Sequence, residues 1–408
     1  MSSLRGVADR ARAIMAMVPF LAVTAVWMAM PTGASSQAQT TGRKIGALPA
    51  INFDADEGFG YGAIAEIYQY GDGSVAPYLW TLQPTVFLTT EGRRDLNVFF
   101  DAPSVLPKGW RLSAFAGTSK QIATPYYGLG NASIYDETLD AEDGPDPFFY
   151  RFGRISHSLT FTLQKDLGTQ GLRGLLGGGL VRTTINPFPE GEGGTLYALD
   201  FGGEEVKHWS NFLRVGVLWD TRDRQTGPRD GTWTEAIVQF VGERPGAADT
   251  YLRWTFTDRR YHSLSDRVVF AHRYLVQGVG ANAPAHDRFK IQSSFKQQEG
   301  FGGSTSARGV AKNRFVGRGI LLWNSELRWQ AIDFRFRGEQ SHVVLSAFLD
   351  QGRVWDGYPD FGEFFSDLHR GYGGGLRLGF GQDFTVSYDF GTSKETGLQV
   401  YIGLGYLY

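Results

Sequence analysis

The sequence contains no cysteine in its 408 residues. This absence excludes a disulfide-stabilised scaffold and any metal site built on thiolates. The 40 lysine and arginine residues nearly balance the 42 aspartate and glutamate residues, so the net charge of −2 gives no argument for nucleic acid binding. The sequence has neither a Gly-x-Ser-x-Gly elbow nor a His-Glu-x-x-His motif, and its 7 histidines are scattered. We therefore expect no enzyme, with no catalytic residue, cofactor or metal ion.

Long apolar runs are lacking beyond the N-terminus. The single run, residues 13–30, follows a basic segment and precedes small residues, which is the pattern of a cleaved signal peptide over residues 1–38. A transmembrane anchor is the alternative, because the run approaches spanning length. Residues 39–57 would then form a short N-terminal segment, and residues 58–408 the main domain.

The sequence is rich in glycine and aromatic residues, with 54 Gly, 30 Phe, 18 Tyr and 10 Trp. Apolar and polar residues alternate along residues 156–164, 251–257 and 398–408. Alternation with period two places the apolar side chains on one face of a strand. Since no helix-type span remains after the leader, the chain can cross a membrane only as a closed barrel.

The predicted fold class is all-β, a transmembrane antiparallel β-barrel of the Gram-negative outer membrane. Fifteen strands are recognisable between residues 59 and 408, and residues 45–55 offer one more. Because bacterial barrels of this type favour even numbers, we expect 16 strands. A soluble β-sandwich or propeller is the alternative.

The expected loops differ in length. The long ones are 121–148 and 280–317, and the short turns are 90–94, 263–266 and 381–383. Short turns usually face the periplasm and long loops the exterior, so the 280–317 loop faces out or folds into the lumen. The acidic run 136–146 reads as a solvated loop, with a divalent-cation site at the cell surface as the alternative.

Five segments carry a family resemblance. They are GVLWDTRD (216–223) with GPRDG (227–231), ARG (307–309), NSELRW (324–329), AFLDQGRVW (347–355) and YGGGLRL (372–378). Their order and spacing resemble the Omp85 superfamily of assembly and translocation barrels, also called bacterial surface antigen D15 or BamA/TamA-like proteins. The match is clearest over residues 210–408. No POTRA module fits between the leader and the first strand, so the resemblance is to the barrel-only branch.

The resemblance implies a role for Arg308 and Gly309 at the tip of a loop folded into the lumen. In the family this arginine pairs with acidic residues of the inner wall, which correspond here to Glu326 and Asp350. Ala307 and Val310 depart from the family pattern, which has a branched and an aromatic residue there. The sequence leaves open which carboxylate Arg308 meets. A flexible surface loop with scattered arginines is the alternative.

Two further groups of residues belong to the resemblance. A charged hairpin contains Asp220, Arg222, Asp223, Pro228 and Gly231, for which we expect a structural role. A C-terminal insertion signal, recognised by the outer-membrane insertion machinery, contains Tyr401, Gly403, Tyr406 and Tyr408. We expect the final aromatic ring at the membrane interface, where it would anchor its strand.

The resemblance implies a part in outer-membrane protein insertion or translocation. The expected partners are outer-membrane lipid, the barrel-insertion machinery and periplasmic chaperones during biogenesis, and a client protein or lipid that the sequence does not name. A passive diffusion pore, or a structural protein without assembly role, is the alternative. An assembly barrel predicts a weak seam between its first and last strands. Glycines near both ends suit such a seam or reflect crowding in the wall: Gly58, Gly60, Gly62, Gly403 and Gly405.

Overall fold

The computed structural model describes residues 41–408 apart from 55–57, 75–77, 91, 104–108, 140–147, 189–193, 225, 245–246, 248, 295–297, 337–338 and 381–383. The expected signal peptide, residues 1–38, lies outside the described residues, as does most of the acidic run, residues 140–146. Among the described residues, no helix is both long and apolar enough to cross a membrane.

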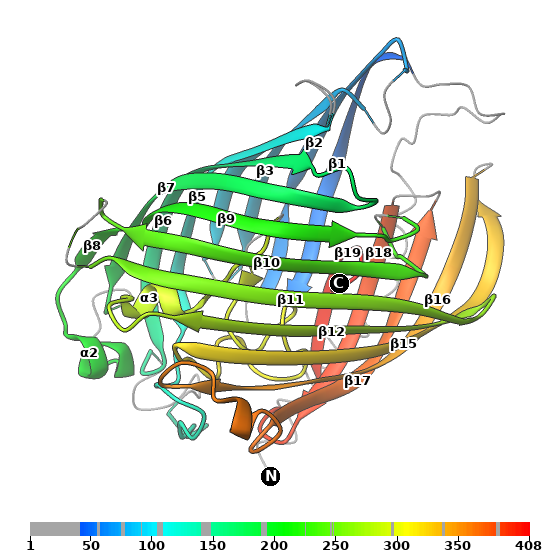
Figure 1. The fold of residues 1–408 in the computed structure, drawn as a ribbon. Coiled ribbons are helices and arrows are strands. Elements are labelled where there is room, and N and C mark those ends of the chain that lie inside the picture. The colour runs from blue at the N-terminus through cyan, green and yellow to red at the C-terminus, as the bar shows by residue number, and fades with distance from the viewer. Residues whose placement is uncertain are drawn as a thin grey trace. The chain divides into compact units, whose positions relative to one another are not determined.

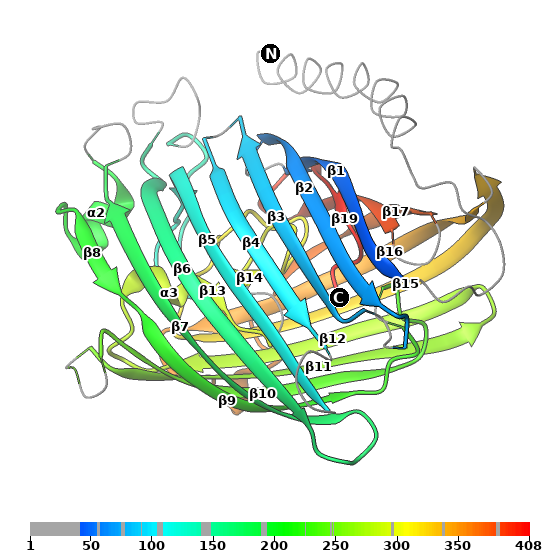
Figure 2. The ribbon, with the colours of Figure 1, turned by 90° about the horizontal axis from the view of Figure 1, so that it is seen from above.

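The described chain forms an antiparallel sheet that is rolled into a barrel (Figures 1 and 2). The wall strands are β1 (Gly42–Asp54), β2 (Gly58–Gly71), β3 (Trp80–Thr89), β4 (Arg94–Ala102), β5 (Trp110–Pro125), β6 (Arg151–Asp166), β7 (Leu172–Asn186), β9 (Asn211–Asp220), β10 (Gly231–Gly242), β11 (Tyr251–Ser265), β12 (Val268–Val279), β15 (Gly319–Phe336), β16 (Glu339–Trp355), β17 (His369–Phe380), β18 (Phe384–Ser393) and β19 (Gln399–Leu404).

Sixteen strands complete the ring within the described part of the chain. The sheet contains 17 strands, of which β8 (Val206–Trp209) pairs only with β7 and lies outside the ring. The last strand, β19, pairs with β1 and so closes the sheet on itself. The expected all-β barrel is confirmed. The first strand, β1, lies within the segment 39–57 and pairs with β2 along its whole length, so the wall begins before residue 58.

Alternation along each strand separates a polar lumen from an apolar outer surface. On β15, Leu327 and Trp329 are 45% and 49% exposed, whereas Asn324, Glu326 and Arg328 are buried. Consecutive side chains of a strand point to opposite faces, so the buried polar set lies inside the barrel. An apolar exterior around a polar interior is the arrangement that a lipid bilayer requires of a spanning barrel.

Strand direction places the connections at two ends of the barrel. Two or three residues join β11 to β12, β15 to β16 and β17 to β18, and we call this the turn end. The long connections 126–150, 187–210 and 280–318 lie at the opposite end, which we call the loop end. The short turn after β3, residues 90–93, falls at the loop end, so the expectation that it belongs with the periplasmic turns is wrong. The direction of the flanking strands, and not the length of a connection, determines the end of the barrel at which the connection lies.

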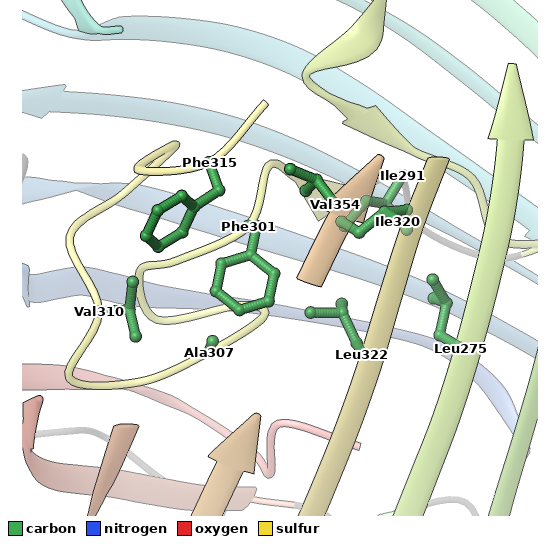
Figure 3. Packing of buried hydrophobic residues seen from close by; sticks show 9 residues of the cluster. All are labelled: Leu275, Ile291, Phe301, Ala307, Val310, Phe315, Ile320, Leu322 and Val354. Carbon is green, nitrogen blue, oxygen red and sulfur yellow. The ribbon is translucent and has the colours of Figure 1, made fainter. Parts of the chain in front are cut away.

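The long connection between β12 and β15 folds into the lumen, as the sequence analysis allowed. It contains α3 (Ala285–Arg288), β13 (Lys290–Ile291) and β14 (Gln298–Glu299). Figure 3 shows its apolar side chains against those of the wall. The buried cluster consists of Ile291, Phe301, Ala307, Val310 and Phe315 from the loop and Leu275, Ile320, Leu322 and Val354 from the wall. Burial of this apolar area holds the loop inside the barrel.

The chain beyond β19 also turns into the lumen. Gly405 has a φ of +78°, and Tyr408 is only 6% exposed. The Tyr408 hydroxyl donates to the backbone oxygen of Ala271 at 3.1 Å, and the Tyr408 backbone oxygen accepts from Arg328 Nη2 at 3.0 Å. The expectation that the final aromatic ring lies at the membrane interface is therefore wrong. Arginine side chains in the lumen supply partners that the interface lacks.

Candidate functional site

The side chain of Arg308 is fully buried at the tip of the lumen loop. Its Nε and Nη2 donate to the two carboxylate oxygens of Asp350 at 2.8 and 3.2 Å, which is the bidentate arrangement of an arginine fork. Its Nη1 donates to Glu326 Oε2 at 2.8 Å and to Asp389 Oδ1 at 3.3 Å. The structure thus brings Arg308 to both acids that the resemblance implied, and adds a third.

An aromatic ring and a backbone hydrogen bond further fix the position of Arg308. Its guanidinium lies 3.6 Å from the centre of the Phe348 ring, within cation–π range. The Arg308 backbone N–H also donates to Asp350 Oδ2 at 3.0 Å. Burial alone lowers the pKa of Arg308, but the neighbouring carboxylates of Asp350, Glu326 and Asp389 outweigh it and raise the pKa well above its ordinary value. The guanidinium therefore stays charged.

Two more arginines balance the acids. Arg328 Nε lies 2.8 Å from Glu326 Oε1, and Arg377 Nη2 lies 2.8 Å from Asp389 Oδ1. Together these contacts join three carboxylates and three guanidiniums, from Glu326, Asp350, Asp389, Arg308, Arg328 and Arg377. We call these six residues the gate cluster. A buried charge is tolerated only when it is paired, so the matched numbers explain how the cluster persists inside the barrel.

Glycines let the loop tip reach the wall. At Gly309, φ is +88° and an added Cβ would lie 2.6 Å from the Thr392 backbone nitrogen. At Gly371 on β17, a Cβ would lie 1.9 Å from the Arg308 backbone oxygen. A side chain at either position would occupy the space of the neighbouring backbone, so the glycine-rich start of β17 is a seat for the loop tip.

The loop tip also contacts the last strand. The Gly309 N–H donates to the Tyr401 hydroxyl at 3.3 Å. Tyr401 lies on β19 and pairs with Asp54 of β1, so it belongs to the seam that closes the barrel. One residue of the expected insertion signal is thus joined to the loop. Gly403 lies on the same strand, and Tyr406 stacks on Arg328 with its ring centre 4.3 Å from the guanidinium carbon.

The charged hairpin forms a separate set at the turn end. Arg222 Nε and Nη2 bind the two oxygens of Asp220 at 2.9 and 3.0 Å, and the Arg222 guanidinium lies 4.3 Å from the Trp233 ring centre. Asp223 Oδ1 accepts from the Arg229 backbone N–H at 3.0 Å. Pro228 is buried in the turn, and Gly231 begins β10. These contacts close a hairpin and involve no member of the gate cluster.

Sequence reasoning missed Asp389 and Arg377, and it also missed a second anchor of the loop. In α3, Asp287 Oδ1 lies 2.5 Å from Lys290 Nζ, and Asp287 Oδ2 accepts from the Tyr251 hydroxyl at 2.5 Å. Arg253 Nη2 donates to the Asp287 backbone oxygen at 2.7 Å. The only available signal was the position of Tyr251 and Arg253 on the lumen face of their strand.

The loop should loosen at acidic pH because of His286. Burial lowers the pKa of this side chain to about 3, and the residue is 2% exposed. A solvent-exposed histidine titrates near 6.5. Between about pH 3 and pH 6.5, the undocked loop therefore binds more protons than the docked loop. We expect docking to weaken as pH falls below about 6.5, by up to about 1.4 kcal/mol per pH unit. Hydrogen exchange of residues 285–291 across this range measures the effect.

The matched variants for this experiment are two histidine substitutions. His286→Gln should abolish most of the pH dependence, whereas His157→Gln, at an exposed position on β6, should leave it unchanged. An identical pH profile in His286→Gln and in the unaltered protein would contradict the assignment.

The comparisons with known proteins agree on the architecture. Residues 85–406 match the model of the Omp85 superfamily domain. Among solved structures, the chain is similar to BamA from Haemophilus ducreyi lacking POTRA domains 1–3, with 14% identity, a TM-score of 0.57, and coverage of 90% of this chain and 71% of that chain. It is also similar to CdiB from Escherichia coli, with 11% identity, a TM-score of 0.58, and coverage of 91% and 64%. The chain thus spans less than two thirds of that CdiB chain. No curated protein matches the sequence.

Proposed function

Since the chain belongs to the Omp85 superfamily, whose domain model matches residues 85–406, we propose that it inserts proteins into the outer membrane or translocates them across it. The chain is an integral outer-membrane β-barrel. In this proposal the lumen loop blocks the barrel at rest, and the gate cluster decides whether the loop stays docked. The fully buried Arg308, bound by three carboxylates from different wall strands, carries the proposal.

A short seam supports a route through the wall. Among the described residues, which exclude 55–57 next to this junction, β1 and β19 pair at Phe53 with Ile402 and at Asp54 with Tyr401, whereas β15 and β16 pair along nearly their whole lengths. Each missing pair removes backbone hydrogen bonds and cross-strand contacts from the junction. Because Tyr401 also holds Gly309, release of the loop would remove a contact from the last strand. Docking of the loop and closure of the seam are therefore coupled in this proposal.

The glycines that the sequence suggests for the seam fall into two groups, because Gly60 and Gly62 lie on β2, next to the seam strand β1, whereas Gly403 lies on the seam strand β19. An added Cβ at Gly60 would lie 2.2 Å from the Phe87 ring, and one at Gly62 would lie 2.0 Å from the Val86 backbone oxygen. These two reflect crowding in the wall. Gly403 has only an ordinary contact with Ser387. The more open space around Gly403 favours weak packing of the last strand, β19.

Depletion of the protein from cells tests the proposal. We expect reduced levels of other outer-membrane proteins or of exported substrates, measured by quantitative proteomics of purified outer membranes and culture medium. Restoration by the unaltered gene is the control. Unchanged levels together with a loss of solute uptake would favour a passive diffusion pore, and unchanged levels with no uptake defect would favour a structural role.

A cross-link across the seam should block function without unfolding the barrel. The chain has no native cysteine, so Phe53→Cys with Ile402→Cys introduces the only pair of thiols. We expect a disulfide under oxidising conditions and loss of complementation in the depletion strain, with recovery on reduction. The same pair placed across a continuous junction, Ser325→Cys with Leu349→Cys, is the control and should complement in both states. Full activity of the oxidised seam variant would rule out a route through the seam.

A further inference from the structure

The turn end of the lumen contains a pocket that the gate cluster does not fill. It has a cavity volume of about 30 Å3 and lies between the β9–β10 hairpin, the turn after β11, and the ends of β15, β16, β18 and the C-terminal residues. This volume exceeds the roughly 10–15 Å3 that one water molecule needs, so the pocket has room for a small polar group. Its charged lining comprises Arg224, Arg229, Arg267 and Arg328, and no acidic residue is among the described residues that line it.

One buried arginine of this lining has spare hydrogen-bonding capacity. Arg328 is 4% exposed; its Nε donates to Glu326 and its Nη2 to the Tyr408 backbone oxygen. Its Nη1 is buried and has no hydrogen-bond partner in the described structure. A buried donor without a partner costs free energy that a bound acceptor would recover. An acceptor at Nη1 would leave the pair with Glu326 intact.

Two rim arginines are positioned by neutral acceptors. Arg229 Nη2 donates to the backbone oxygens of Ser265 and Asp266 at 2.9 and 2.8 Å. Arg267 Nη1 donates to those of Gln330 and Ala331 at 3.4 and 3.2 Å. Carbonyl groups orient a guanidinium without cancelling its charge. These side chains are therefore held in place while remaining positive.

The nearest rim acids neutralise the pocket only in part. Arg224 Nε lies 3.7 Å from Asp223 Oδ2, and Arg267 Nη2 lies 3.4 Å from Asp333 Oδ2. Both arginines are about half exposed, and such pairs contribute little when water surrounds them. The pocket thus presents an excess of positive charge toward its interior.

We propose that this pocket binds a phosphate group. Guanidinium forks match the oxygens of oxyanions, and several forks from different directions suit a tetrahedral group better than a planar carboxylate. Arg328 would donate from the floor, and Arg224, Arg229 and Arg267 from the rim. A free phosphate compound and a phosphate-bearing lipid headgroup share this chemistry.

Titration of the full-length protein with inorganic phosphate tests the site, in phosphate-free detergent and with calorimetric detection. We expect saturable binding that weakens by about tenfold or more in the double variant Arg224→Gln/Arg267→Gln, because charge-assisted hydrogen bonds are lost. These rim positions lie outside the gate cluster, so the variant should keep the heat-modifiable mobility of a folded barrel. Arg335→Gln, an exposed arginine near the same end of β15 that does not line the pocket, is the matched control.

A second experiment distinguishes a soluble phosphate compound from a phosphate-bearing lipid headgroup. The protein is reconstituted in phosphatidylcholine nanodiscs with and without phosphatidic acid, and inorganic phosphate is titrated into both. Binding of inorganic phosphate in both discs identifies a soluble phosphate compound, and weaker binding in the presence of phosphatidic acid identifies the lipid headgroup as competitor. The proposal is overturned if inorganic phosphate binds in neither detergent nor phosphatidylcholine discs and phosphatidic acid has no effect. It is also overturned if inorganic phosphate binds equally to the folded double variant and to the unaltered protein.

Discussion

Arg308→Ala is expected to release the lumen loop and raise the conductance of the barrel in planar bilayers. The substitution removes the cation shared by Asp350, Glu326 and Asp389, and leaves these three carboxylates with the two guanidiniums of Arg328 and Arg377. Loss of one partner from a buried ion pair costs about 3–5 kcal/mol. We also expect protease cleavage within residues 280–318, which the docked loop resists.

Two other substitutions make this test specific. Arg308→Lys keeps the charge but loses the fork that binds Asp350, so its conductance should lie between those of the alanine variant and the unaltered protein. Arg318→Ala removes a half-buried arginine from the base of the same loop, where it donates to the Asp356 backbone oxygen, and should change little. Unchanged folding and conductance in Arg308→Ala would falsify the gating role.

Gly371→Ala should undock the loop tip by steric exclusion while leaving every charge in place. The new Cβ would lie 1.9 Å from the Arg308 backbone oxygen, so either the loop or β17 must move. Overpacking of this kind costs about 1–3 kcal/mol, and more where backbone is the obstacle. We expect raised conductance and cleavage of the loop, as for Arg308→Ala.

Gly374→Ala is the control on the same strand. Its Cβ would meet only the Ser346 backbone oxygen, at 3.3 Å, which a small adjustment relieves. If both glycine variants behaved alike, a general weakening of β17 would explain the result, and the seat for the loop tip would be disproved.

The sequence predicts much of the wall, because alternation along a strand depends only on local order. It places Glu326 and Arg328 on the lumen face of β15, opposite Leu327 and Trp329, as the structure confirms. Alternation does not give the height of a residue within the barrel, which depends on the tilt of each strand and on its stagger against its neighbours. Asp389 and Arg377 therefore carried no signal that they meet Arg308.

Two errors have specific physical causes. The end to which a turn belongs follows from the number of strands before it. The sequence leaves open whether residues 45–55 form a strand, so the length of the turn 90–93 is the only guide to its side. The position of Tyr408 depended on where β19 ends. The strand stops at Leu404, and the left-handed conformation of Gly405 redirects the chain toward Arg328. A single glycine in an aromatic-rich segment does not reveal such a turn.

The lumen loop is joined to the wall at both of its ends, through β12 and β15. Its tip therefore cannot diffuse away when it leaves the gate cluster, and redocking is an intramolecular event at a high effective concentration. Under the proposed function, the resting barrel is a population of docked and undocked states whose ratio changes tenfold for every 1.4 kcal/mol. Under the proposed function, a client would open most molecules once its preference for the undocked state exceeded the free energy of docking, and its departure would let the loop return unaided.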